Sequence, residues 1–376
     1  MMEKMMLNLN SLATMLFTCD LHAYKDAVLT FDEWINVEKN LKVHGLSGPG
    51  CLFGLSADEL MDILDISEYT SYKIVQRMKT MNVFLKHIYE YEQKGIRIIT
   101  KYDEEYPQIL SKKMKKNAPT CLFVVGNLPV EFEGISLTGL QTVTKKEKGC
   151  IKRLVDKINN ENKWLISNDC KGVDQEAFQY ALHHHGHIIS FLCEKMEDKA
   201  MEYKRYIRSG NLVLLSAIDP IKRFTVTHAI DRNSYVCGLS KFQVVVSSKI
   251  NSGATWFTIM HNMHHNWTIS LVIDNDCFGN QRLLEMKTVP IYIKNIVTYE
   301  ILLCSREEKY MSEFIKDIDK DLGTIISKKM HMQPVLAEKW SWKILNEYPE
   351  DLKNVIRKWA KDEQIPEIEY SRISLE

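Results

Sequence analysis

The stretch ISNDCKGVDQEAFQYALHHHGHIISFL, residues 166–192, decides the fold class of this chain. It opens with a hydrophobic run that stops at a small polar residue, Ser167, and it continues with Gly172 and, two residues later, Asp174. A helical pattern and a second hydrophobic run follow. This order predicts a strand, a loop, a helix and a second strand, which is the repeating unit of a parallel sheet.

Length and composition indicate a globular protein of ordinary type. The 376 residues are enough for two or three domains, and 45% of them are hydrophobic while 26% are charged. Lys and Arg together number 49, as do Asp and Glu, so the whole molecule has no net charge that would attract an anionic polymer. Any nucleic-acid site must therefore be a local basic patch.

Cysteine usage and hydropathy favour a cytoplasmic location. The nine cysteines contain no CxxC pair, which argues against a zinc ribbon or a redox dithiol and is typical of reduced thiols. No apolar run reaches the roughly 18 residues that a membrane-spanning helix needs. We therefore expect a cytoplasmic protein without a membrane partner.

The rhythm of the sequence changes twice along the chain. Residues 31 to about 110 have apolar positions at helical spacing, with Ser56 as an N-cap and Glu59 as its capping-box partner. From Cys121 to Ile293 short hydrophobic runs recur, most of them separated by segments long enough for a helix, which predicts a parallel sheet. These runs are CLFVV, GISLTGL, KWLIS, HIISFLC, NLVLLSAI, KFQVVVSS, WTISLVI and VPIYI. After Ile293 the pattern is helical again.

Ligands of open parallel sheets bind outside the carboxyl ends of the strands. We therefore expect the functional loops to begin at Gly139, Ser167, Ser216, Ser247 and Asp274.

Glycines at these loops are suited to a phosphate site. Gly139 and Gly172 follow predicted strands, where a residue without a Cβ lets backbone N–H groups approach an anion. The helix that starts near Asp174 presents its positive end to the same loop, and Ser252, Gly253 and Thr255 form a similar strand-to-helix turn. The alternative is that these glycines only permit tight turns.

Six segments, in order, resemble the motifs of the DNA-processing protein A family (DprA, also called Smf). SNDCKGVDQEAFQYALHHHG is similar to the family's SGxAxGID loop, and KYDEEYPQIL and APTCLFVVGN are similar to its D-xx-YP-xx-L and PxxLFxxGN motifs. FTVTHAIDRNSYVCGLSKFQVVVSS resembles the RNRIIAGLS segment, NSGATWFTIMHN resembles xSGALxTA, and GNQRLLEMKTVPI resembles GxNxLIxxGAxPI. The resemblance extends from about Leu55 to Ile293.

The resemblance implies an α/β fold with an extended Rossmann-like parallel sheet. Residues 1–115 would form an N-terminal helical, SAM-like domain and residues 116–295 the Rossmann-like domain. The helical pattern beyond the resemblance, and not the resemblance itself, predicts a C-terminal helical extension over residues 296–376. It also implies a non-enzymatic, cofactor-free homodimer that binds single-stranded DNA and assists a RecA-type recombinase in transformation. The implied DNA or phosphate contacts are Gly139, Gln141, Ser167, Lys171, Gly172, Asp174, Arg232, Asn233, Ser252, Gly253 and Thr255. Of these, Lys171 and Arg232 are expected to face the same anion.

The sequence departs from the family pattern at the phosphate loops. The family's G-S-R reads Gly139-Leu140-Gln141 here, and the second arginine of R-N-R is Ser234. Two guanidinium groups that clamp phosphate in a bidentate manner are therefore absent, and weaker binding is expected. Lysines beyond the first loop offer compensation, although such a run is more often a solvated helix face. They are Lys145, Lys146 and Lys148, followed by Lys152 and Arg153.

Two other functions fit the same scaffold. A pocket that has lost two arginines is compatible with a small nucleotide or a nucleotide-derived signal, as in a sensor of a defence system. A degenerate relative that binds only protein is the third possibility. The histidines at 183–187 and 261–265 have no Cys or carboxylate partners at ligand spacing, so we expect no metal site.

Overall fold

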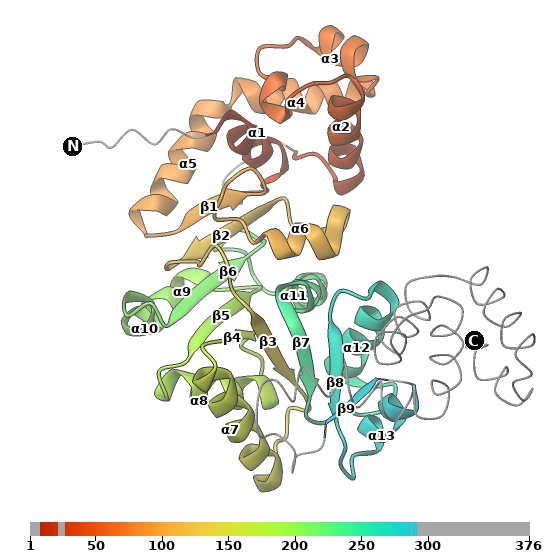
Figure 1. Ribbon diagram of the computed structural model, residues 1–376. Coiled ribbons are helices and arrows are strands. Elements are labelled where there is room, and N and C mark those ends of the chain that lie inside the picture. Colours follow the sequence, from red (N-terminus) through yellow and green to blue (C-terminus); the bar gives the residue numbers. More distant parts are fainter. Residues whose placement is uncertain (1–7, 22–26, 287, 292–376) are drawn as a thin grey trace, which may run out of the picture. The chain divides into compact units, whose positions relative to one another are not determined.

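The computed structural model describes residues 8–21, 27–286 and 288–291 (Figure 1). The chain divides into two compact units, the first of residues 1–271 and 275–282 and the second of residues 272–274 and 283–376. The predicted C-terminal extension, residues 296–376, lies outside the described residues. No helix in the described part of the chain is long and apolar enough to cross a membrane.

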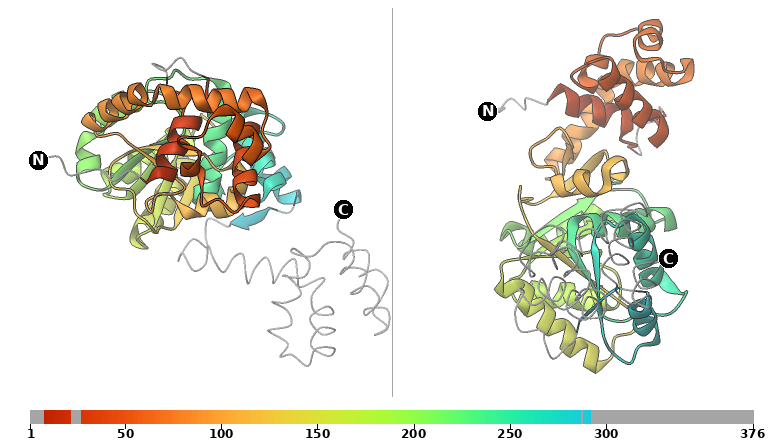
Figure 2. Two further views of the ribbon diagram at one scale, coloured as in Figure 1. Left: turned by 90° about the horizontal axis from the view of Figure 1, so that it is seen from above. Right: turned by 45° about the vertical axis from the view of Figure 1, so that its right-hand side comes forward.

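The first unit begins with a group of helices that packs at the β1 and β2 edge of the sheet (Figures 1 and 2). The capping box predicted at Ser56 is confirmed, since its hydroxyl accepts from the Glu59 amide and the Glu59 carboxylate accepts from the Ser56 amide. The buried guanidinium of Arg77 donates to the carbonyl oxygens of Leu16 and Cys19, at 2.6 and 2.9 Å. The α-helices are α1 (Leu9–Thr18), α2 (Phe31–Val43), α3 (Ala57–Leu64), α4 (Glu68–Lys79) and α5 (Met81–Gln93).

The described residues contain nine strands in one sheet, in the order β1-β2-β6-β5-β4-β3-β7-β8-β9. β6, β5, β4, β3 and β7 are parallel, whereas β2 runs antiparallel to both β1 and β6. The strands are β1 (Arg97–Thr100), β2 (Cys121–Val125), β3 (Gly134–Thr138), β4 (Trp164–Ser167), β5 (His187–Leu192), β6 (Leu212–Ser216), β7 (Ser240–Val245), β8 (Ile269–Ile273) and β9 (Val289–Ile291).

All eight predicted hydrophobic runs contain a strand, so the parallel-sheet prediction is confirmed. The helical interpretation of residues 31–110 is wrong at one place, because Arg97–Thr100 pairs with β2 as an edge strand. The physical reason is that the apolar Ile98 and Ile99 gain a partner strand that lies beyond them in the sequence. The boundary at residue 115 stays a prediction.

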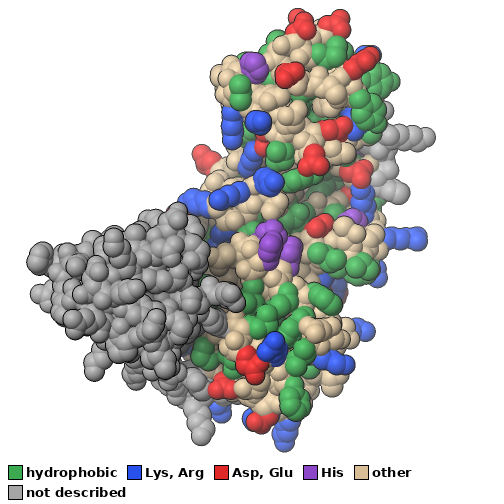
Figure 3. Space-filling model, turned by 90° about the vertical axis from the view of Figure 1, so that its right-hand side faces the viewer, with side chains coloured by type: hydrophobic (Ala, Val, Ile, Leu, Met, Phe, Trp, Pro, Cys, Tyr) green, Lys and Arg blue, Asp and Glu red, His purple; other side chains and the backbone are tan. Residues whose placement is uncertain are grey.

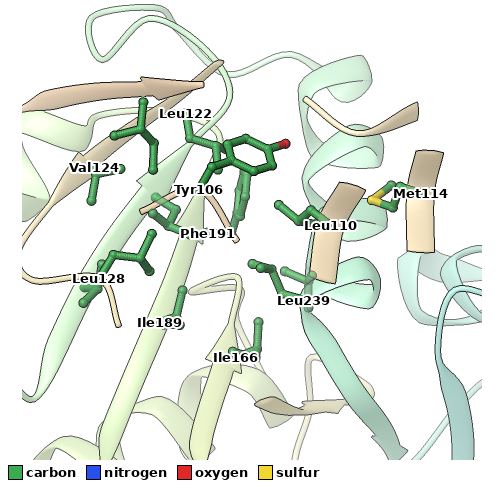
Figure 4. Packing of buried hydrophobic residues seen from close by; sticks show 14 of the residues in the cluster. Tyr106, Leu110, Met114, Leu122, Val124, Leu128, Ile166, Ile189, Phe191 and Leu239 are labelled. Carbon is green, nitrogen blue, oxygen red and sulfur yellow. The ribbon is translucent and has the colours of Figure 1, made fainter. Parts of the chain in front are cut away.

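Helices cover both faces of the sheet, as expected for a Rossmann-like fold. α7 (Lys145–Asn160) and α8 (Val173–His183) pack on one face, and α11 (Val226–Leu239) packs on the other beside α6 (Gln108–Met114) and α12 (Gly253–His265). Figure 4 shows the core beneath α11, where Tyr106 and Leu110 of the α6 segment meet Phe191 of β5 and Leu239.

The strand order places a switch point between β3 and β7. From β3 the chain moves outward through β4, β5 and β6, and it then returns to add β7 on the other edge of β3. Thr138 and Val245 are register partners at the carboxyl ends of these two strands. The loops that leave β3 and β7 therefore part at the position where open parallel sheets bind ligands.

Candidate functional site

The loops after β3 and β4 are packed backbone to backbone at the switch point. Gly172 has φ +100°, and a Cβ built there would lie 2.2 Å from the carbonyl oxygen of Leu140. A Cβ on Gly139 would lie 2.4 Å from Cγ2 of Val173. The two glycines thus allow a close contact between the loops that a side chain would block, which is a structural role other than the tight turns considered from the sequence.

Asp174 is bonded inward and holds the loop after β4. Its carboxylate accepts hydrogen bonds from the Ser167 hydroxyl at 2.8 Å and from the backbone amides of Asn168 and Cys170 at 3.1 and 3.2 Å. Burial raises the pKa of Asp174 to about 6, against the lowering effect of these bonds and of Arg232. Ser167 and Asp174 therefore fix the shape of the loop.

Two neighbouring side chains of α11, Arg232 and Asn233, connect this helix to the loops after β4 and β5 and to α12. The guanidinium of Arg232, only 8% exposed, donates to the Asn168 carbonyl oxygen at 3.3 Å, to Cys193 Sγ at 3.2 Å and to Asn233 Oδ1 at 3.1 Å. Asn233 donates in turn to the Thr258 hydroxyl on α12 at 3.1 Å. Most of the hydrogen-bonding capacity of Arg232 is therefore used inside the protein.

The turn into α12 completes the switch point. The hydroxyl of Thr255 donates to the Gly139 carbonyl oxygen at 2.8 Å, which joins the loops that leave β3 and β7. Gly253 has φ +81° and open space around it, and the Ser252 side chain makes no capping hydrogen bond.

The motif residues surround a hollow of about 180 Å³. The predicted site residues among its lining are Gly139, Gln141, Lys171, Asp174, Asn233, Ser252, Gly253 and Thr255. Ser167, Gly172 and Arg232 are not in that lining. Ser167 bonds to Asp174, and Gly172 packs against Leu140. The structure thus brings most of the predicted set together.

A larger cleft, about 980 Å³ in volume, adjoins this hollow. The two share Lys171, Asn233 and Gly253, so one continuous depression runs from the switch point toward α11 and α12. Arg232 lines the cleft, together with Lys195 and Lys199 from the segment after β5.

The lysines of the cleft fall into two groups. Lys199 is paired, with its Nζ 2.8 Å from Asp169 and 3.3 Å from Glu202. Lys171 and Lys195 are exposed, and among the described residues neither ammonium group has a hydrogen-bond or ion-pair partner. These two lysines are therefore available to an anionic ligand.

The cleft also carries exposed apolar side chains. Phe224 is 50% exposed and Phe257 is 62% exposed, and Val226 and Ile230 between them are also exposed. Figure 3, which views the first unit from the side of α12, shows hydrophobic side chains gathered beside histidines on this face. Exposed apolar groups concentrated in a depression indicate a binding surface.

The proposed auxiliary lysines lie elsewhere. Lys145, Lys146 and Lys148 are exposed in the first turn of α7, and none of them lines the hollow or the cleft. Lys148 pairs with Glu176, and Lys146 lies 3.9 Å from Asp276. Their contact with a ligand stays a prediction.

Sequence reasoning missed Lys195, Lys199, Phe224 and Phe257. A signal for the two lysines was present, because they follow the hydrophobic run HIISFLC just as the predicted loops follow the other runs. The two phenylalanines gave no such signal, since Phe224 and Phe257 are 33 positions apart and line the same cleft only in the folded protein.

The model of the DNA recombination-mediator protein A (DprA) family matches residues 97–298, which is more than half of the chain. The chain belongs to the DprA family. No curated protein matches the chain. Membership assigns it to a family of DNA-handling proteins.

Two solved DprA structures are similar to the chain. The X-ray structure of DprA from Streptococcus pneumoniae has a TM-score of 0.57 and 19% sequence identity, and the similarity covers 73% of this chain and 93% of that one. DprA from Helicobacter pylori, described for its single-stranded DNA binding mode, has a TM-score of 0.47 and 18% identity over 56% of this chain and 96% of that one. The likeness to the Streptococcus protein shows that the fold is that of DprA.

Proposed function

We propose that this DprA-family chain binds single-stranded DNA in the cleft without cutting it, in DNA uptake, recombination or a related pathway. The observation that carries the proposal is the presence in one depression of exposed phenyl rings and of two lysines, Lys171 and Lys195, that have no partner among the described residues. Binding without base sequence preference needs these two kinds of group, namely cations for the phosphates and aromatic faces for the bases.

The aromatic groups favour a single strand over a duplex. In a duplex the bases are stacked on one another, so their faces are not offered to a protein. Unpaired bases stack on aromatic side chains with about 1–3 kcal/mol per base. Phe224 and Phe257 are exposed enough to accept such stacking.

The hollow at the switch point suits a smaller group. Its volume of about 180 Å³ is below that of small-molecule sites, which begin at about 300 Å³. A single phosphate of the strand fits this space, next to Lys171 and the start of α12. We assign no catalytic residue, since the Asp174 carboxylate is used in fixing its loop.

Fluorescence anisotropy with labelled oligonucleotides tests the proposal. We expect binding of single strands of unrelated sequence at micromolar protein concentration, affinity that falls steeply between two salt concentrations, and much weaker binding of a duplex of the same length. Absence of single-strand binding at low salt would contradict the proposal. Equal affinity for duplex and single strand would remove the proposed role of the phenylalanines.

A small nucleotide is the second candidate. The cleft volume of about 980 Å³ lies within the range of small-molecule sites, about 300–1,000 Å³. Under this alternative, nucleotides raise the melting temperature of the protein while oligonucleotides bind negligibly. Thermal shift measurements with mononucleotides and dinucleotides, run beside the anisotropy titrations, separate the two.

We further propose a homodimer, and a RecA-type recombinase as partner, both on the basis of the family. The exposed side chain of Met263 on α12, which is not part of the cleft lining, is compatible with a contact between subunits. Light scattering should then give twice the chain mass of 43.8 kDa. A monomer throughout the micromolar range would contradict the dimer.

A further inference from the structure

A second hollow, of about 570 Å³, lies at the opposite edge of the sheet from the cleft. It is lined by Ile96, just before β1, and by Val125 and Gly126 at the end of β2. A Cβ on Gly126 would lie 2.9 Å from the carbonyl oxygen of Leu212, the first residue of β6. The second hollow therefore adjoins the amino end of β6, whereas the cleft adjoins the carboxyl ends of β4 and β5.

One helical segment links the two depressions. β5 ends at Leu192 and β6 begins at Leu212, so α9 (Met196–Glu202) and α10 (Lys204–Arg208) cross the sheet from its carboxyl edge to its amino edge. Lys195 and Lys199 at the start of this segment line the cleft. Lys204 and Arg208 at its end line the second hollow. The twelve helical residues of α9 and α10 correspond to about 18 Å of helix.

The end of the segment that lies at the second hollow carries exposed basic side chains. Lys204 and Arg208 are four residues apart on α10, which places them on the same side of that helix. Both are exposed, as is Arg205, and within the described part of the chain none of the three has a hydrogen-bond or ion-pair partner. Glu197, the carboxylate in the lining, is already paired with Lys94 at 2.8 Å.

The surface between these cations is apolar. Met201, at the end of α9, is 71% exposed, and Ile96, Val125 and Ile207 line the hollow with it. The flexible thioether of Met201 above this apolar floor can adapt to ligand groups of different shape. The second hollow thus repeats the combination found in the cleft, namely an apolar floor with cations that have no partner in the described part of the chain.

We propose that the second hollow is a further contact for the same single strand, which leaves the cleft, passes over α9 and α10, and reaches Lys204 and Arg208. This inference rests on the proposed function. It extends the site beyond the switch-point loops to the amino end of β6, beside the end of the APTCLFVVGN segment. A very short oligonucleotide fills the cleft alone, whereas a longer strand contacts both depressions.

A length series of oligonucleotides tests the inference, with single strands of increasing length titrated against the wild type and against Lys204→Ala/Arg208→Ala. For the shortest strands that bind, the two proteins should have the same affinity. For long strands the variant should bind about tenfold more weakly, and its salt slope should be smaller by about 1.4, the value for two phosphate contacts on a single strand. Lys42→Ala/Lys112→Ala, which removes two exposed lysines of α2 and α6, is the matched control and should follow the wild type.

The outcomes separate this inference from the function on which it rests. If no strand of any length binds to the wild type, the proposed function itself is wrong. If the wild type binds but the variant equals it at every length, the second hollow is not a DNA contact. A loss that is the same for short and long strands also contradicts the inference, because it places Lys204 and Arg208 in the primary site. Circular dichroism of the variant confirms that it is folded.

Discussion

Two neighbouring sets of polar side chains at the strand ends behave differently. Asp174, Arg232 and Asn233, which belong to the family motifs, direct their hydrogen bonds to other parts of the protein. Lys171 and Lys195 on the rim of the cleft have no partner among the described residues. Asp174, Arg232 and Asn233 form an inward set that shapes the loops. Lys171 and Lys195 form an outward set, on which we propose that binding depends.

Burial explains the difference. A buried charge is costly unless it is bonded, so Arg232, at 8% exposure, is held by the acceptors around it. An exposed lysine keeps its hydration and exchanges it for a phosphate at little cost. Substitutions in the inward set should therefore reduce stability, whereas substitutions in the outward set should reduce affinity.

The largest effect is expected from Gly172→Ala. The new Cβ would meet the Leu140 carbonyl oxygen at 2.2 Å, and the backbone has φ +100°, which L residues rarely adopt. We expect a loss of more than about 4 kcal/mol in the free energy of unfolding, measured by urea denaturation. Gly149→Ala, on α7 with open space around it, is the control and should be neutral or slightly stabilising. Similar stability of the two variants would show that the loops are not locked together.

Arg232→Ala should have the next largest effect. From sequence alone Arg232 was expected to face the ligand, and its loss would then weaken binding without unfolding the protein. Because its guanidinium bonds to Asn168, Cys193 and Asn233, we now expect the free energy of unfolding to fall by about 3 kcal/mol. Arg223→Ala, at an exposed position, should change stability little. Unchanged stability together with lost DNA binding would show that Arg232 contacts the ligand, as the sequence had predicted.

A smaller effect concerns the pH dependence of stability. The pKa of Asp174 is raised by burial to about 6, above its ordinary value of 3.8, so the folded state favours the protonated form. This contribution is complete below the unfolded pKa and is lost as pH rises through 6. The stability advantage of the wild type over Asp174→Asn should therefore shrink by about 2 kcal/mol between pH 4.5 and 7. An advantage that grows with pH would mean that the ionised carboxylate is the favoured form.

Most of the fold could be predicted from the sequence, because the hydrophobic runs of a buried parallel sheet are continuous and therefore easy to recognise. Strand β1 could not be predicted, because its four residues come three residues after helix α5 and gain a pairing partner only in the folded sheet. Gly95 was the one local sign that the helix ends there.

The candidate site was only partly predictable. The motifs located the loops correctly at the switch point, but residue type does not reveal direction. Arg232 and Asp174 have the chemistry of ligand contacts and are bonded inward, while Phe224 resembles an ordinary core residue and is half exposed. Which side chains remain unpaired is decided by packing between distant segments, and a single sequence does not record that packing.

The most direct test of the central claim is the affinity of Lys171→Ala and Lys195→Ala for a labelled single strand, with melting temperatures measured on the same samples. Each substitution removes a charge-assisted contact, so affinity should fall at least about tenfold while the melting temperature stays within about 1 °C of the wild type. Lys112→Ala, an exposed lysine on α6, should bind like the wild type. Wild-type affinity in both cleft variants would contradict the account, because it would show that the outward set of side chains does not hold the DNA.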